Sequence, residues 1–253
     1  MLAKLSIDQT LVKAKSHITK NEIAEAQNLY KEILRLFPKN IRAQKGLAAL
    51  QNHTLVNSIQ TSPSFLLNKL VMLYNQGNFT TVVEQAQFLT KQYPGAFIIW
   101  NILGAAHKNL GQIELASEAF KKVTELNPNF ADGFNNLGIS LKDQEKIDKA
   151  LEAFKKALLI KPDYPEVYNN IGNAFKYQNK FKEAIEAYEK AISLKPDYAD
   201  AYNNMGVALK DKGSFKEAIK AYNKALTIKP DYAEAHCNKG ITLQKLGEFE
   251  EAK

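Results

Sequence analysis

Cysteine is almost absent from this sequence. Cys237 is the single cysteine among 253 residues, so no intrachain disulfide can form and no cysteine-rich zinc site is available. A chain with one thiol fits a reducing compartment best, and we expect a cytoplasmic protein.

Long apolar runs are also missing. A membrane-spanning helix needs roughly 18 or more consecutive apolar residues, and no stretch of this chain approaches that length. Residues 1–20 alternate polar and apolar side chains and lack the continuous apolar segment of a signal peptide. We therefore expect no membrane partner.

Neither sign of charge dominates. The 34 lysines and arginines exceed the 27 aspartates and glutamates, which gives a formal net charge of +7, but the two signs are interspersed along the chain. A nucleic-acid-binding protein gathers its basic residues into one stripe with aromatic side chains between them. We therefore expect a mixed-sign surface and no nucleic-acid partner.

Prolines are few but regularly spaced. Five of the eight follow one another at intervals of 34: Pro94, Pro128, Pro162, Pro196 and Pro230. Their surroundings also recur, as in KPDYPEVYNNIG at 161–172 and KPDYADAYNNMG at 195–206. A fixed period of this length is the signature of a repeat array, in which each unit packs on its neighbours.

We number each repeat so that its proline is position 32. The array 63–253 then consists of a divergent repeat at 63–96, four regular repeats at 97–130, 131–164, 165–198 and 199–232, and a partial repeat at 233–253.

Small and aromatic residues recur at fixed positions of these repeats. Position 8 is glycine (Gly104, Gly138, Gly172, Gly206 and Gly240), position 20 is alanine (Ala116, Ala150, Ala184, Ala218 and Ala252), and position 24 is aromatic (Phe120, Phe154, Tyr188 and Tyr222). Dense packing places a large side chain where small ones leave room. The columns therefore predict two closely packed helices in each repeat.

Each repeat is predicted to form two helices, because apolar residues recur at 3.6-residue spacing on both sides of a short turn. Gly111, Asn179, Gly213 and Gly247 occupy the turn and tolerate the left-handed conformation that ends a helix, whereas Glu145 departs from this pattern. The proline then ends the second helix. We predict an all-α solenoid of antiparallel helix pairs.

The amino-terminal part is less regular. Pro38 implies a further repeat at 7–40, with Ala14, Ala26, Tyr30 and Ile33 at packing positions, but residues 41–62 break the period. We expect one more helix over 41–51, a loop or a weak helical turn over 52–62, and a flexible joint in this connection, 41–62. The predicted domains are thus a helical cap at 1–62, with an irregular connection at 41–62, and the array 63–253.

The runs FNNLG at 134–138, YNNIG at 168–172 and YNNMG at 202–206 resemble the tetratricopeptide repeat family. The resemblance covers residues 63–253 and, less closely, 7–40. It implies a right-handed superhelix whose first helices line a concave groove that binds extended peptides or helices of a protein partner.

A narrower resemblance is to the superhelix of O-linked N-acetylglucosamine transferase. It implies that the position-6 asparagines form a ladder that hydrogen-bonds a bound peptide backbone; here they are Asn136, Asn170, Asn204 and Asn238. A side-chain amide offers both donor and acceptor, so such a row can pair with an extended backbone of any sequence. Ile102 occupies position 6 one repeat earlier, so the ladder should begin at residue 131.

The asparagines have a second interpretation. Those at position 6 could instead bond between adjacent helices, and those at position 5 (Asn101, Asn135, Asn169 and Asn203) are predicted to bond the neighbouring helix. Asparagine is an indifferent helix former, so two of them in mid-helix in each repeat call for a specific reason.

Two charged columns complete the predicted binding site. Position 2 carries Asp132, Glu166, Asp200 and Glu234, and position 12 carries Lys108, Lys142, Lys176 and Lys210. The resemblance assigns the acids to the groove, and the lysines could reach its edge. The alternatives are that the acids only support helix starts, together with Asp163, Asp197 and Asp231 as N-caps, and that the lysines form a solvated face.

No catalytic constellation is found. His17, His53, His107 and His236 fall in different repeats, and adjacent residues such as His236 and Cys237 point in different directions on a helix. Every glycine is explained by the repeat, so no phosphate-binding loop is indicated. We expect no enzyme activity in these residues, no cofactor and no metal site.

Three functions fit the pattern. The first is a scaffold that binds an extended segment of a partner in the groove. The second is the substrate-recruiting arm of a larger glycosyl-, sulfo- or methyltransferase, because the array resembles bacterial proteins with such domains and the chain stops at Lys253, inside a predicted second helix. The third is self-assembly into homo-oligomers through that uncapped end.

Overall fold

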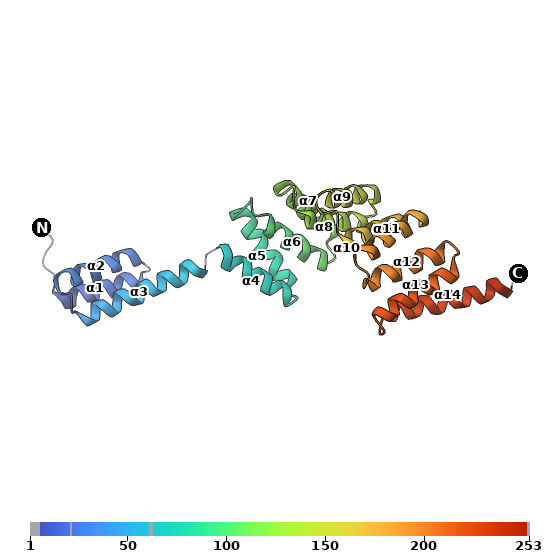
Figure 1. The fold of residues 1–253 in the computed structure, drawn as a ribbon. Coiled ribbons are helices and arrows are strands. Elements are labelled where there is room, and N and C mark those ends of the chain that lie inside the picture. Colours follow the sequence, from blue (N-terminus) through green and yellow to red (C-terminus); the bar gives the residue numbers. More distant parts are fainter. Residues whose placement is uncertain (1–5, 21, 61–62, 252–253) are drawn as a thin grey trace. The chain divides into compact units, whose positions relative to one another are not determined.

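The computed structural model describes residues 6–20, 22–60 and 63–251, with side chains left undescribed at 52–60, 63 and 248–251. The described residues form fourteen α-helices and no strand (Figure 1). The helices are α1 (Ile7–Thr19), α2 (Ile23–Leu36), α3 (Ile41–Gln60), α4 (Pro63–Asn75), α5 (Phe79–Gln92), α6 (Phe97–Asn109), α7 (Ile113–Leu126), α8 (Ala131–Asp143), α9 (Ile147–Ile160), α10 (Pro165–Tyr177), α11 (Phe181–Leu194), α12 (Ala199–Asp211), α13 (Phe215–Ile228) and α14 (Ala233–Glu251). The predicted all-α class is confirmed.

The chain divides into two compact units, residues 1–69 and 70–253. In the first unit, α1 and α2 pack together and α3 packs on α2. Their core contains the residues expected from the period, namely Ala14, Ala26, Tyr30 and Ile33. The helix pair predicted at 7–40 is therefore present.

The loop predicted for residues 52–62 is wrong for residues 52–60, which are helical. Helix α3 runs without interruption from Ile41 to Gln60, and residues 61 and 62 lie outside the described part of the chain. The segment 52–60 contains neither proline nor glycine, and its β-branched and polar residues lower helix propensity only weakly. Nothing in this sequence ends the helix that starts at 41. The flexible joint stays a prediction.

In the second unit, α6, α8, α10 and α12 each pack against the second helix of their own repeat and of the preceding one, and α14 packs on α13 (Figure 1). The pairs are α6 with α7, α8 with α9, α10 with α11, and α12 with α13. Each second helix ends two residues before the repeat's proline, as at Ile160 before Pro162. Proline restricts its predecessor to extended backbone, so the helix must end before that residue.

The close packing predicted for each pair is present. A Cβ built on Gly138 would lie 2.5 Å from the ring of Phe154, and the equivalent atom on Gly206 would lie 2.5 Å from the ring of Tyr222. Both aromatic side chains are fully buried. In the divergent repeat the sizes are exchanged, because Leu70 stands at position 8 and Ala86 at position 24, and both are fully buried.

The turns between paired helices use left-handed backbone. The φ angle is 72° at Gly111, 88° at Gly213, 58° at Asn179 and 61° at Glu145. Glu145 thus adopts this conformation although its residue type departs from the pattern.

The turn predicted at Gly247 is wrong, because this residue lies inside α14. In the other repeats the second helix folds back onto the first after this turn, and no such helix follows α14 among the described residues. Ala252, expected at position 20, lies outside them. No described helix has the combination of length and apolar character needed to cross a bilayer.

Candidate functional site

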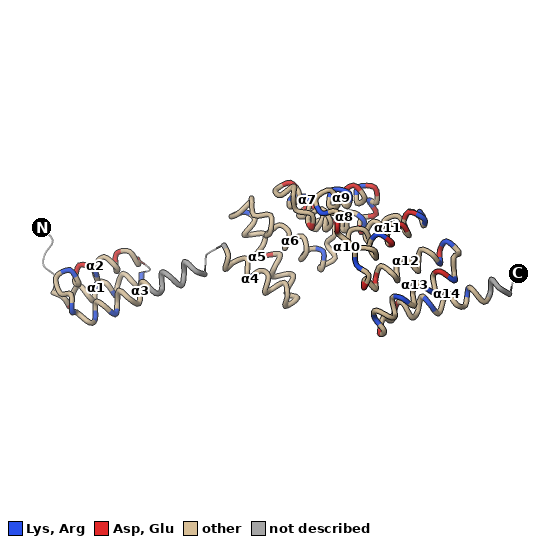
Figure 2. Tube along the Cα trace, viewed as in Figure 1, with Lys and Arg blue, Asp and Glu red and all other residues tan. Residues whose placement is uncertain are grey.

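The predicted site residues all lie on first helices of the repeats. We call the surface formed by positions 2, 5, 6, 9 and 12 of α6, α8, α10, α12 and α14 the first-helix face. Over α7 to α13 acidic and basic residues alternate, whereas α5 and α6 carry few charges (Figure 2). The mixed-sign character expected from the sequence is therefore found in the regular repeats.

Hydrogen bonds between asparagines connect successive repeats. In each case Nδ2 of a position-6 asparagine donates to Oδ1 of the position-5 asparagine 35 residues earlier. The four bonds are Asn136 to Asn101 (3.2 Å), Asn170 to Asn135 (2.9 Å), Asn204 to Asn169 (3.0 Å) and Asn238 to Asn203 (3.1 Å). The predicted bond of position 5 to the neighbouring helix is confirmed, and the first position-6 residue bonded in this way is Asn136, as Ile102 implied.

In three of the four bonds the two asparagines differ in burial. Asn135, Asn169 and Asn203 are 8%, 6% and 1% exposed, whereas their position-6 partners are only half-buried. One N–H of each position-6 amide is used between repeats. Its Oδ1 accepts no hydrogen bond from the described residues, and it is not one of the buried side-chain atoms that lack a hydrogen-bond partner. This oxygen is therefore not fully buried, and the side chain as a whole is partly exposed.

The position-2 acids do not work with aspartate caps. The N-cap residues of α10 and α12 are Tyr164 and Tyr198, and neither helix has a side-chain capping bond. The capping role predicted for Asp163 and Asp197 is therefore wrong, since the helix begins one residue later than the pattern suggested. Glu166 and Asp200 do lie in the first turn, where a negative charge favours the helix dipole.

Instead, the acids meet tyrosines at position 34. Tyr164 Oη donates to Oδ1 of Asp132 over 2.7 Å, and burial together with this bond raises the tyrosine pKa well above its usual range. The pKa of Tyr232 is raised in the same way by burial and by Asp200. These tyrosines were not predicted as site residues. Their sequence signal is the KPDY run, which recurs at 161–164, 195–198 and 229–232.

A lysine covers each of these tyrosine rings. The ammonium groups of Lys161, Lys195 and Lys229 lie 4.1, 4.9 and 4.8 Å from the ring centroids of the tyrosines three residues later. Lys195 also lies 3.7 Å from Glu166 Oε1. The position-2 acids are thus already engaged within the chain, Asp132 by Tyr164 and Glu166 by Lys195, each near the other end of the same repeat.

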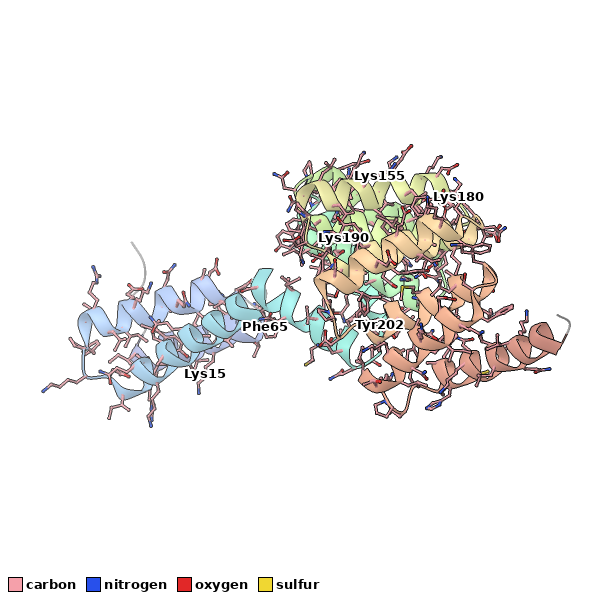
Figure 3. All side chains as sticks on the ribbon, turned by 45° about the vertical axis from the view of Figure 1, so that its right-hand side comes forward. Lys15, Phe65, Lys155, Lys180, Lys190 and Tyr202 are labelled. Atoms are coloured by element: carbon pink, nitrogen blue, oxygen red, sulfur yellow. The ribbon has the colours of Figure 1, made fainter. Side chains whose placement is uncertain are left out.

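The position-12 lysines are not a fully solvated face. Lys108, Lys142, Lys176 and Lys210 are all half-buried. Lys142 pairs with Asp143 at 2.8 Å and Lys210 pairs with Asp211 at 3.3 Å. By contrast, Lys155 and Lys190 of the second helices are exposed at the outer surface (Figure 3).

Two hollows lie outside the first-helix face, between successive second helices. One, of about 640 Å³, is lined by Trp100, Leu103 and His107 together with residues of α5 and α7. The other, of about 750 Å³, is lined by Phe134, Leu137 and Leu141 together with residues of α7 and α9. The first-helix residues that line both hollows occupy repeat positions 4, 7 and 11, where the first helix contacts the two neighbouring second helices. The asparagine columns line neither hollow.

The histidines act as local helix contacts. His107 Nδ1 lies 2.6 Å from Gln112 Oε1, and His17 Nδ1 lies 2.6 Å from Glu22 Oε2, at the same repeat positions. Both pairs join the end of a first helix to the start of the second. Among the described residues, no group of three or more histidine, cysteine, aspartate or glutamate side chains is arranged to hold a metal ion.

Family models match the regular half of the chain. A model described as TPR repeat matches residues 140–176, 172–213 and 208–247, and two described as tetratricopeptide repeat match 98–130 and 119–152. Together they extend from residue 98 to residue 247, which is more than half of the chain. No curated protein sequence matches it.

Solved structures with a similar fold include MamA, which is 26% identical; the match covers 68% of this chain and 93% of MamA, with a TM-score of 0.59. TTC0263 of Thermus thermophilus, described as a thermophilic TPR protein, is 20% identical over 72% of this chain and all of its own, with a TM-score of 0.60. YrrB, described as a TPR protein with an unusual peptide-binding site, is 19% identical over 74% of this chain and 97% of its own, with a TM-score of 0.58.

Proposed function

Because the chain belongs to the tetratricopeptide repeat family, we propose that it is a protein-interaction scaffold that binds an extended segment of a partner along the first-helix face. The segment lies over α8, α10, α12 and α14, whose position-6 asparagines contact its backbone. Asp132, Glu166, Asp200, Lys142, Lys176 and Lys210 flank this path and contact its side chains.

The observation that carries this proposal is the orientation of the position-6 amides. Each is fixed by one hydrogen bond to the preceding repeat, as between Asn170 and Asn135. An extended backbone presents N–H and C=O groups, and the accessible Oδ1 and N–H of each amide match both of them. Because the amides are already fixed, little side-chain freedom is lost on binding.

The charged columns support a partner with side chains of both signs. The position-2 acids are engaged by tyrosine and lysine side chains of the chain itself, so a ligand contact there must share them. The lysines at position 12 are half-buried on the same helices. Backbone contacts would therefore supply most of the affinity. Charged contacts would determine which residue of the partner segment lies over which repeat.

Binding can be separated from structure with two variants of one hydrogen bond. Asn170→Ala removes both the bond to Asn135 and the accessible acceptor, whereas Asn135→Ala removes the bond but leaves the amide of Asn170 in place. Random peptides displayed on phage are selected on the immobilised full chain, and the selected peptides are measured by calorimetry. We expect Asn170→Ala to weaken them about tenfold, as loss of one hydrogen-bonding amide does, and Asn135→Ala to weaken them much less.

Equal losses in the two variants would assign the asparagines to structure alone and contradict the proposal. A failure to select any peptide that depends on Asn136, Asn170 or Asn204 would contradict it as well. The transferase arm and the self-assembling scaffold stay hypotheses. They predict, respectively, a catalytic sequence in the same reading frame and a concentration-dependent sedimentation coefficient.

A further inference from the structure

Helix α10 differs from its neighbours at position 9 of the first-helix face. This position is Ile139 in α8 and Val207 in α12 but Asn173 in α10. The hydroxyl of Tyr188 donates to Oδ1 of Asn173 over 2.8 Å, which fixes the plane of the amide. Its Nδ2 donates to no acceptor among the described residues, so α10 presents two unused N–H groups here.

Lys176 lies three residues further along, on the same side of α10, since residues three apart are neighbours on a helix surface. Its repeat lacks the acid that follows the equivalent lysines, because Tyr177 stands where α8 has Asp143 and α12 has Asp211. Within the described parts of the chain, no carboxylate comes within 4.0 Å of the Lys176 ammonium.

Burial lowers the pKa of Lys176, because the half-buried ammonium has lost part of its hydration. Asp211 and Glu234 act in the opposite direction, and the smaller effects of Lys210 and Lys142 add to that of burial. The two acids therefore offset the effect of burial only in part.

Those two acids are already occupied. Asp211 pairs with Lys210, and Glu234 accepts a hydrogen bond from Asn203. A half-buried cation with no carboxylate in contact is stabilised by an anion that comes into contact with it.

We propose that Asn173 and Lys176 form a carboxylate-binding subsite, occupied by an aspartate or glutamate side chain of the bound partner segment. The inference rests on the proposed function, since the segment must cross α10 to reach it. A carboxylate has two oxygens and one charge, which match the amide N–H groups and one ammonium. A dianion such as a phosphate ester fits less well, because Asp211 and Glu234 are close enough to repel it.

The carboxylate belongs to a side chain rather than to the end of the partner. Asparagine amides continue on both sides of α10, at Asn136 in α8 and at Asn204 in α12. A segment that uses these amides extends past Lys176 in both directions. A terminal carboxylate at this point would leave half of the row without a ligand.

The subsite can be tested without any knowledge of the partner. Acetate is titrated into the isotope-labelled full chain, and the side-chain amide signals of Asn173 are followed by NMR, with acetamide as the neutral control probe. We expect saturable shifts with acetate only. Asn173→Asp keeps the acceptor for Tyr188 but removes both N–H donors, and Lys176→Met keeps the packing of the stem but removes the charge. In Asn173→Asp, which has no side-chain amide, the backbone amide signal of Lys176 is followed instead. Both variants should abolish the acetate shifts.

Lys155→Met is the matched control, because it removes an exposed lysine of the second helix α9, away from the first-helix face. This variant should retain the acetate shifts. The subsite would be refuted if acetate caused no shifts in the unsubstituted chain, or if the shifts were unchanged in Lys176→Met.

Peptides selected on the chain distinguish failure of the subsite from failure of the proposed function. In a peptide that depends on Asn170, exchange of its acidic residue for the amide should weaken binding about tenfold, and this loss should vanish in Lys176→Met. Amidation of the peptide's carboxyl terminus should have no effect. Peptides that depend on Asn170 but are indifferent to these exchanges would refute the subsite and leave the scaffold function intact.

Discussion

Asn204 donates from Nδ2 to Oδ1 of Asn169, which lies 35 residues earlier and 3.0 Å away. Asn169 is buried, and Asn204 is half-exposed on the first-helix face. One side chain therefore both joins two repeats and presents an acceptor to the outside. Binding and stability are linked at this position, and a simple deletion of the ladder affects both.

Asn204→Ala should lower the free energy of unfolding by roughly 1–3 kcal/mol, because it leaves the buried oxygen of Asn169 without a donor. The bond between Asn204 and Asn169 is therefore expected to contribute to stability as well as to binding. Urea denaturation followed by circular dichroism measures the effect. Asn223→Ala, the same substitution at an exposed site of α13, is the control and should leave the midpoint unchanged.

Removal of the tyrosine hydroxyl at position 24 should affect stability differently in two repeats. Tyr188→Phe deletes the bond to Asn173 and should cost about 1 kcal/mol of stability. Tyr222 is equally buried, but its hydroxyl has no hydrogen bond of acceptable geometry to the described residues, because Val207 stands at the equivalent position 9. Tyr222→Phe should therefore leave stability unchanged or raise it. A larger loss for Tyr222→Phe than for Tyr188→Phe, in thermal denaturation of both variants, would contradict this assignment.

Glu145 should be replaceable by glycine with a gain in stability. Its φ of 61° costs a residue with a Cβ about 1 kcal/mol relative to glycine, and its bond from the exposed Tyr177 hydroxyl is worth little in water. The reciprocal variant Gly213→Glu should lose stability, because the φ there is 88° and no other atoms crowd the site. Opposite shifts of the melting temperature are expected, and shifts of the same sign would argue against backbone strain.

Stability should fall in strong alkali as tyrosines ionise. Burial raises the pKa of Tyr198 from 10.0 to about 12, with smaller contributions from Glu166 and Asp200. The unfolded chain loses this proton near pH 10, while the folded chain keeps it to about pH 12. The contribution is therefore complete below about pH 10 and is lost as the pH rises to about 12. Urea midpoints at about pH 9 and about pH 11 measure the fall, which Tyr198→Phe should make smaller.

Much of the fold follows from local sequence. The intervals between Pro128, Pro162 and Pro196 give the repeat, and each of these three prolines follows the end of a second helix. The pairing of Gly138 with Phe154 also follows, because the two positions share one repeat and their sizes are complementary. Where local signals were weak the prediction was less accurate: α3 continues to Gln60, and Gly247 stays helical, with no second helix after α14 among the described residues.

The sequence by itself thus determined the helices, the period and the small and aromatic columns, since these depend on contacts within one repeat. The tertiary structure decided which side chains meet when they lie on helices distant in sequence. Only the packing of the helices brings Asn136 to Asn101 of the preceding repeat, places the Tyr164 hydroxyl on Asp132 at the other end of the same repeat, and half-buries Lys176 without an acid beside it. These relationships join residues about one repeat length apart or depend on the burial of a charge. Both depend on the angle at which one helix pair packs on the next, which the local sequence does not specify.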